Sequence, residues 1–124
     1  MNKTSMLRKL IMEHLQTVQG GTHYRQATSS TGYPYKTFDL SGISYLDSTR
    51  DDYELVVDIW DRSPDQKTVE EIADQIEALF NAANIPRPPI FPTFFRDGRN
   101  NITDPDKTLQ HIQLHFIVQL YEEE

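Results

Sequence analysis

Apolar residues in the first twenty positions recur at the spacing of one helix face. That face comprises Leu7, Leu10, Ile11, Leu15 and Val18. Steps of three and four residues place such side chains on one side of an α-helix. Thr4 or Ser5 can cap its start, and Gly20-Gly21 can end it, because glycine tolerates the left-handed backbone conformation. The pattern therefore predicts an amphipathic helix over residues 5–19.

Alternating apolar and polar residues predict two long strands, and two further segments are predicted as short strands. Residues 53–60 place Tyr, Leu, Val and Ile on one face, while Glu, Val, Asp and Trp share the other. Residues 111–121 alternate in the same way over about ten positions, which is long for a strand. Short strands are predicted over residues 33–38 and 93–96. Pro34 donates no backbone hydrogen bond, so it belongs at a strand start or on an edge.

A second helix and several connections complete the pattern. Thr68 and Glu71 have capping-box spacing. The apolar stripe that follows consists of Val69, Ile72, Ile76, Leu79 and Phe80. Four of the seven prolines lie within residues 86–92, which predicts a stiff extended connector, and residues 23–32 and 97–106 are predicted loops. The order helix-strand-strand-helix-strand-strand predicts an α+β fold: a mostly antiparallel sheet of about four strands with two helices packed on it.

Composition limits the class of protein. A chain of 124 residues fits a single domain over residues 1–124, with residues 122–124 as an acidic tail. Cysteine is absent, which excludes disulfide frameworks, thiolate metal sites and cysteine nucleophiles. The longest uninterrupted apolar run has three residues, as at Leu10 to Met12, so neither a membrane span nor a signal-peptide core is expected. We expect a cytosolic protein without a membrane partner.

Charge is acidic overall and unevenly distributed. The net charge is −7, so the chain is a poor candidate for binding the phosphate backbone of nucleic acids. Residues 1–36 carry five bases and one acid, whereas residues 37–77 carry three bases and twelve acids. Such a split is common on a solvated surface. It also allows the basic segment of one copy to face the acidic segment of another copy.

Acidic and histidine residues suggest two kinds of metal chemistry, and neither is well supported. His111 and His115 have the spacing of helical zinc ligands, but on a strand they lie about 13 Å apart and cannot share one ion. Asp65-x-Lys67 has the form of the acid-x-lysine triplet of metal-dependent nucleases, to which Asp58 could add a carboxylate. Lys67 falls at a helix start, which favours a turn-and-cap role for the triplet. We expect no catalytic residue, cofactor or metal.

Two polar segments are candidate protein contacts. The segments 39–52 and 94–101 are long and rich in turn residues, and Phe and Arg are frequent in interface anchors. The candidate contact residues are Asp47, Asp51, Asp52, Phe94, Phe95, Arg96 and Arg99. Alternative roles for the 94–101 segment are core packing by one Phe and contact with single-stranded nucleic acid. Trp60 is expected in the core.

Several motifs occur in an order that resembles a known family. Tyr33-Pro34-Tyr35 opens a strand, and an acidic loop separates it from Leu55-Val56-Val57-Asp58-Ile59-Trp60-Asp61. A capped helix with Val69-Glu70-Glu71-Ile72 follows, and Gln113-Leu114-His115-Phe116 lies in the closing strand. Over residues 5–121 the chain resembles the tail completion, or tail terminator, proteins of long-tailed bacteriophages and prophages. Tyr33, Pro34, Tyr35, Asp58 and Trp60 then count as structural motif residues.

The resemblance implies a structural role without catalysis. Members of the family are small α/β proteins, made in the host bacterial cytoplasm, that form rings, typically hexamers, at the head–tail junction of the virion. The ring caps the tail tube and docks to the head connector, or stopper, and DNA passes through its channel without specific binding. The proline-rich stretch from Ile85 to Pro92 departs from the family pattern. Three alternatives remain: another neck component such as a head-completion or adaptor protein, a small metal-dependent nuclease using Asp58, Asp65 and Lys67, and a host regulatory binding module.

Overall fold

The computed structural model describes residues 2–28, 32–43 and 50–122. Within these ranges the chain forms helices and strands in the order α1 (Lys3–Leu15), β1 (Gly21–Tyr24), β2 (Tyr35–Gly42), β3 (Arg50–Arg62), α2 (Lys67–Leu79), β4 (Ala83–Asn84), β5 (Ile90–Asn101) and β6 (Leu109–Glu122). The strands form one sheet in the order β1-β2-β3-β6-β5-β4. Among the strands of the described residues, β1 and β2 pair in parallel and the other neighbours are antiparallel.

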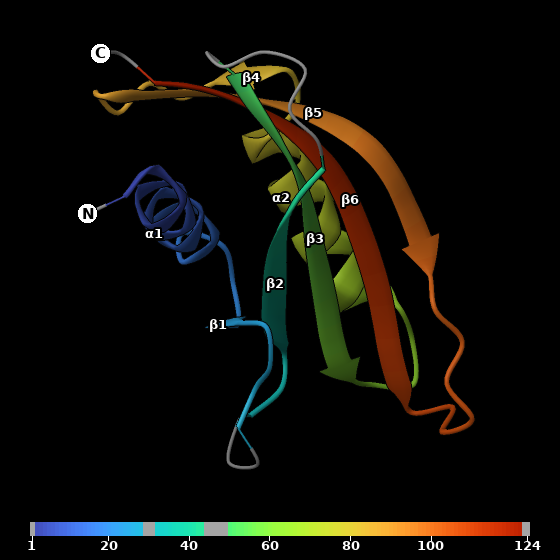
Figure 1. Ribbon diagram of the computed structural model, residues 1–124. Coiled ribbons are helices and arrows are strands. Elements are labelled where there is room, and N and C mark those ends of the chain that lie inside the picture. The colour runs from blue at the N-terminus through green and yellow to red at the C-terminus, as the bar shows by residue number, and fades with distance from the viewer. Residues whose placement is uncertain (1, 29–31, 44–49, 123–124) are drawn as a thin grey trace.

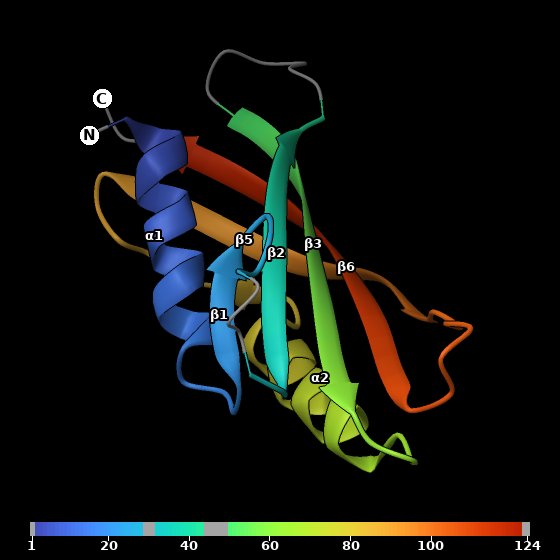
Figure 2. The same ribbon diagram turned by 90° about the horizontal axis from the view of Figure 1, so that it is seen from below.

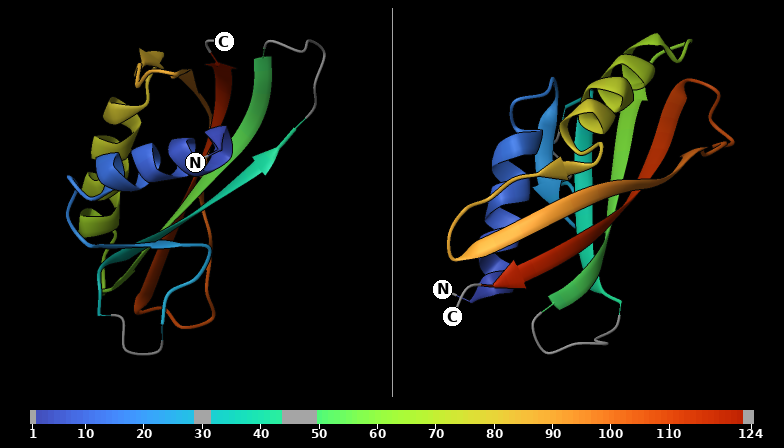
Figure 3. Two further views of the ribbon diagram at one scale, coloured as in Figure 1. Left: turned by 60° about the vertical axis from the view of Figure 1, so that its left-hand side comes forward. Right: turned by 90° about the horizontal axis from the view of Figure 1, so that it is seen from above.

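Both helices lie on the same side of the sheet, as Figure 1 and Figure 3 show. α1 lies beside β1, and α2 lies against β3 and β6 (Figure 2). No helix among the described residues is long and apolar enough to cross a membrane. The molecule is therefore a two-layer arrangement in which one face of the sheet receives the helices.

The core lies between the helices and the sheet face that they cover. The central pair β3 and β6 is in register over thirteen residues, from Arg50 opposite Tyr121 to Arg62 opposite Leu109. Every second side chain of each strand is buried against the helices, as at Leu55 opposite Phe116. A period of two is what a sheet with one covered face requires. The predicted strands over residues 53–60 and 111–121 are confirmed.

The first helix buries the predicted apolar face. Its buried side chains are Leu7, Leu10, Ile11 and Leu15, with Val18 buried just beyond the end. The cap is not Thr4 or Ser5, because the Asn2 side chain accepts the bond from Ser5 N at 2.8 Å. Gly20 has a positive φ of 94°, and an added Cβ would lie 3.0 Å from the Pro34 carbonyl oxygen. Glycine is therefore required where the chain turns from α1 to β1.

The second helix also buries its predicted stripe, but not through the predicted cap. Val69, Ile72, Ile76 and Phe80 are buried, and Phe80 contacts Phe94 of β5 with ring centroids 4.6 Å apart. No side chain caps the helix at the N-cap position, so the capping box expected from Thr68 and Glu71 does not form.

The predicted sheet is wrong in strand number and in strand direction. The expected mostly antiparallel sheet of about four strands is a mixed sheet of six strands among the described residues. β1 lies within and just before the segment predicted as a loop, and it pairs in parallel with β2 from Gly21 opposite Tyr35 to Tyr24 opposite Phe38. It has four residues and no apolar alternation, so the sequence carries no strand signal there. β4 has two residues. β5 continues to Asn101 and so includes the first part of the loop predicted over residues 97–106.

A buried lysine joins the end of the first helix to the sheet. Lys36 lies on the covered face of β2, opposite Ile59, and is fully buried. Its Nζ donates to the carbonyl oxygens of Val18, Gln19 and Gly20 at 3.1, 3.0 and 2.6 Å. Burial lowers the pKa of Lys36 to about 8. The side chain thus satisfies three carbonyl groups that follow α1 and fixes that turn against β2.

Replacing this lysine by a side chain of similar length without a donor is expected to destabilise the fold. Lys36→Met leaves three carbonyl oxygens without their donor, which costs about 1–3 kcal/mol in the free energy of unfolding at pH 7. Urea denaturation measures the difference, and Lys107→Met at an exposed position is the matched control. Equal stability of Lys36→Met and wild type would contradict this role.

The same lysine makes stability depend on pH in a predictable direction. The folded chain releases this proton near pH 8, whereas the unfolded chain holds it up to the ordinary value of 10.5. Raising the pH across this window therefore stabilises wild type relative to Lys36→Met. Urea denaturation of both proteins at pH 7.5 and pH 10 is expected to show the widening difference.

Candidate protein-interaction face

Among the described residues, no helix covers one face of the sheet. The side chains of β3 and β6 that point away from α1 and α2 are half-buried, and they alternate with the core residues. We call this side of the sheet the open face. Its members are Tyr35 and Asp39 of β2; Glu54, Val56, Asp58 and Trp60 of β3; His111, Gln113, His115 and Ile117 of β6; and Phe95 of β5. These side chains, rather than a cleft, are what the open face offers to a partner.

Four rings form a row across one end of the open face. Tyr35, Trp60 and His111 lie directly opposite one another on β2, β3 and β6. The ring centroids of Trp60 and His111 are 3.6 Å apart and stacked, and those of Tyr35 and Trp60 are 6.2 Å apart. Tyr33 extends the row, with its centroid 5.4 Å from that of Tyr35. Burial, and then the nearby Tyr33, raise the pKa of Tyr35 above its ordinary value. We call Tyr33, Tyr35, Trp60 and His111 the aromatic row.

The aromatic row places Trp60 differently from the prediction. Trp60 is half-buried on the open face and is not part of the core cluster. Its position follows from the register, because it shares a strand face with Asp58 and not with Ile59. The expectation that Trp60 packs in the core is therefore wrong.

The two histidines belong to a chain of hydrogen bonds and not to a metal site. Asp58 Oδ1 lies 2.6 Å from His111 Nε2 and accepts from Gln113 Nε2 at 3.0 Å. Gln113 Oε1 lies 2.8 Å from His115 Nε2, and His115 Nδ1 lies 3.2 Å from Glu54 Oε1. Among the described residues, no three acidic, histidine or cysteine side chains gather where one ion could bind them. These polar groups are engaged with each other, which suits a fixed surface.

The three residues of the nuclease hypothesis have separate local roles. Asp58 belongs to the hydrogen-bond chain on the open face. Asp65 Oδ1 accepts from the backbone N–H of Lys67 at 3.0 Å, where α2 begins. Lys67 is exposed at the first position of that helix. Asp65 thus stabilises the turn before α2, which agrees with the turn role that the sequence favoured, although no side chain caps the helix at its N-cap position.

The segment 94–101 is the second half of strand β5 and contains a β-bulge. Phe94 is fully buried, whereas Phe95 is 38% exposed on the open face. The register shifts by one residue at Asp97, so Arg96 and Arg99 both point toward α2. A bulge reverses the alternation in this way.

Both of these arginines bind one buried carboxylate of α2. Arg96 Nε lies 3.0 Å from Glu77 Oε2, and Arg99 Nη1 lies 2.7 Å from Glu77 Oε1. Arg99 also lies 2.8 Å from Asp74 Oδ1. Arg96 and Arg99 thus attach β5 to α2. Of the four candidate contact residues in this segment, Phe95 lies on the open face.

The acidic candidates between residues 39 and 52 also lie in different surroundings. Asp51 is buried and forms an ion pair with Lys3 of α1. Asp52 is half-buried, and its Oδ1 lies 2.9 Å from Arg50 Nε. Asp47 lies outside the described residues. Asp51 therefore ties the first helix to β3, and Asp52 remains at the surface of the sheet.

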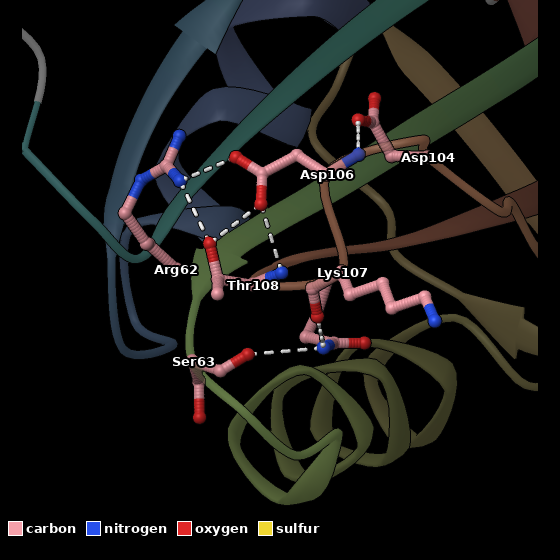
Figure 4. Close-up of polar contacts among 7 residues, drawn as sticks. Arg62, Ser63, Asp104, Asp106, Lys107 and Thr108 are labelled. Atoms are coloured by element: carbon pink, nitrogen blue, oxygen red, sulfur yellow. Dashed lines mark hydrogen bonds and ion pairs between the residues drawn. The ribbon is translucent and has the colours of Figure 1, made fainter.

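A group of polar residues that the sequence analysis did not single out lies beside the aromatic row. It joins the end of β3 to the loop between β5 and β6. Figure 4 shows Arg62 of β3 reaching Asp106 Oδ2 at 2.7 Å and Thr108 Oγ1 at 2.9 Å. Asp106 Oδ1 accepts from Thr108 N at 2.9 Å, and Asp104 Oδ1 accepts from Asp106 N at 2.9 Å. Bonding to Arg62, and then to Thr108, lowers the pKa of Asp106 to about 2. The Arg62 guanidinium carbon is thereby held 5.3 Å from the Tyr33 ring centroid.

Comparison with known proteins identifies the family. The family described as tail completion protein gp17 matches residues 6–121. No curated protein matches the chain. A solved chain from the virion of a native gene transfer agent particle has a TM-score of 0.67 at 9% identity, over 90% of this chain and 84% of that one. A second solved protein has a TM-score of 0.71 at 8% identity, over 98% of this chain and 94% of the other.

The structural matches show a shared fold, because their identities are too low to show more. The family match covers nearly all of the chain, including both helices and the open face. It also agrees with the resemblance found over residues 5–121. The chain therefore belongs to the tail completion protein gp17 family and is a structural protein of a bacteriophage tail.

Proposed function

We propose that this chain is a tail terminator, which forms a ring, typically of six copies, on the finished tail tube. The ring joins the tail to the head connector. The family match carries the proposal, because it assigns the chain to proteins that complete phage tails. The structure supports a role through surfaces, since Asp58, His111, Gln113, His115 and Glu54 on the open face bind one another.

The sheet edges favour contacts through faces over pairing of strands between subunits. β1 has four residues and β4 has two. β5 extends beyond β4, but its outer part carries the bulge at Asp97 and the charged Arg96 and Arg99. Short strands, bulges and charges on an edge discourage pairing with another chain. The open face is then the larger surface available to a neighbouring subunit or to another virion protein.

The acidic character of the chain suits passage of DNA through such a ring. Most described acids between residues 39 and 58 are engaged by basic or histidine side chains, as at Asp39 with Arg25. Glu70 and Glu71, in contrast, are exposed on α2, and no ion pair joins them to another described residue. A wall of carboxylates repels phosphates, whereas a basic wall retains them. We infer that Glu70 and Glu71 face the channel.

Charge reversal on α2 is expected to slow the delivery of DNA. Particles carrying Glu70→Lys with Glu71→Lys would retain phosphates in the channel, and DNA release triggered in vitro would be slower at low salt than at high salt. Glu70→Gln with Glu71→Gln is the matched control, because it removes charge without adding attraction. Release at the wild-type rate by the lysine variant would contradict the placement of these residues.

Loss of the chain is expected to separate heads from tails. Electron microscopy of particles produced without it should show unjoined heads and tails of uncontrolled length, because nothing stops the tube or offers a docking surface. Supplying the wild-type chain in the same cells should restore joined particles. Joined particles with uniformly long tails in the absence of the chain would overturn the proposed function.

A further inference from the structure

The proline-rich segment that departs from the family pattern forms a stiff projecting turn. Arg87 N donates to Ile90 O at 2.9 Å, and Ile90 N donates to Arg87 O at 3.0 Å. Pro88 and Pro89 form the tip of this turn and are exposed. Proline rings restrict the backbone, so little conformational entropy is lost when such a segment binds a partner. We call residues 85–92 the proline knuckle.

The proline knuckle is fixed at its base. Ile90 is fully buried in the core. Arg87 Nη1 lies 2.7 Å from Glu13 Oε2 of α1, so the turn is attached to the first helix as well as to β5. Lys9 lies beside this ion pair, lining a cavity of about 250 Å³ with Met6, Glu13 and Arg87. Lys9 itself forms no ion pair with another described residue.

An apolar hollow lies on the other side of the knuckle. It has a volume of about 430 Å³, and four of its lining residues are Pro86, Phe91, Pro92 and Tyr121. Tyr121 is 43% exposed. The hollow and the proline tip together present proline and aromatic rings to the surroundings, and the residues that line the hollow include no acidic side chain.

The aromatic row lies at the opposite end of the sheet. On β6 the knuckle is level with Tyr121, which pairs with Phe91, whereas the row is level with His111. The two positions are ten residues apart along β6, which corresponds to about 33 Å. Figure 3 shows the start of β5 and the start of β6 at opposite ends of the molecule.

The chemistry of the two ends is complementary. Exposed proline rings can pack on aromatic rings, and the closed turn that carries Pro88 and Pro89 loses little entropy on binding. The aromatic row offers such rings, and Tyr33 at its end is 44% exposed. Asp58, beside the row, is bound to a histidine and an amide, and Lys9, near the knuckle, has no ion-pair partner among the described residues. The groups next to the two surfaces are thus of opposite charge, and the surfaces themselves are aromatic at one end of the sheet and proline-rich at the other.

We propose, on the basis of the ring proposed above, that the proline knuckle of one copy docks on the aromatic row of the next copy. Tyr33 of the second copy enters the hollow beside Pro86 and Phe91. The two surfaces are different and lie at opposite ends, so the contact is head-to-tail. Such contacts repeat from subunit to subunit and close into a ring when the rotation allows it.

Cysteine cross-linking tests this contact directly, because the chain has no cysteine of its own. The chain with Pro88→Cys and Tyr33→Cys is supplied as the sole copy in cells that produce the particles, and purified particles are treated with a short bis-maleimide. Both positions are exposed, and a thermal melt of the purified chain checks that it folds. Pro88→Cys with Gln75→Cys, at an exposed position of α2, is the matched control.

The expected result is a ladder of linked copies on a denaturing gel for the Pro88/Tyr33 pair and monomers for the Pro88/Gln75 pair. Particles that contain the chain but give only monomers with the Pro88/Tyr33 pair would overturn this contact and leave the ring intact. A ladder with the control pair alone would overturn it as well. Joined particles that lack the chain altogether would overturn the proposed function itself.

Discussion

The pairing of β3 with β6 fixes which side chains form the core and which form the open face. The two strands are in register over thirteen residues at the centre of the sheet. A slip of one residue would turn the side chains of one strand to the opposite face. Asp58 and Trp60 would then face the helices, and Leu55 and Ile59 would face away from them. The cost of burying Asp58 without its histidine and amide partners makes such a slip unfavourable.

The helices are joined to this sheet by polar links as well as by apolar packing. Lys36 binds the carbonyl groups that follow α1, and Asp51 binds Lys3 at its start. Glu77 of α2 binds the two arginines that the bulge of β5 brings to the same side. These links all lie on the helix side of the sheet. They hold both helices on that side, so the aromatic row and the hydrogen-bond chain lie on the opposite face. The two sides of the sheet therefore differ, and the uncovered side can contact other subunits.

The long elements could be predicted from the sequence, because each has a clear period. The burial of Leu7 to Leu15 and the alternation from Tyr53 to Ile59 appear in the structure as expected. β1 and the end of β5 were missed for physical reasons. β1 takes its hydrogen bonds from β2 at the sheet edge and needs no apolar face. β5 contains Arg96, Asp97 and Arg99, whose polarity suggested a loop, but the bulge and Glu77 make them compatible with a strand.

The residues of the open face could be predicted only in part from the sequence. Trp60 shares its strand face with Asp58, and this phase places it on the open face, although its apolar ring led us to expect it in the core. Arg62 could not be linked to Asp106 and Thr108 in advance, because it lies more than forty positions from both along the chain. The family resemblance rested on short ordered motifs, and the family match over residues 6–121 confirms it.

The proposed function depends on the face of the sheet that the helices leave uncovered. Hydroxyl-radical footprinting of the free chain and of intact particles tests this dependence most directly. Oxidation of Tyr33, Trp60 and Phe95 should fall in particles relative to the free chain, while the fully buried Phe94 should remain unmodified in both. Equal oxidation of the open-face side chains in the free chain and in particles would contradict the account.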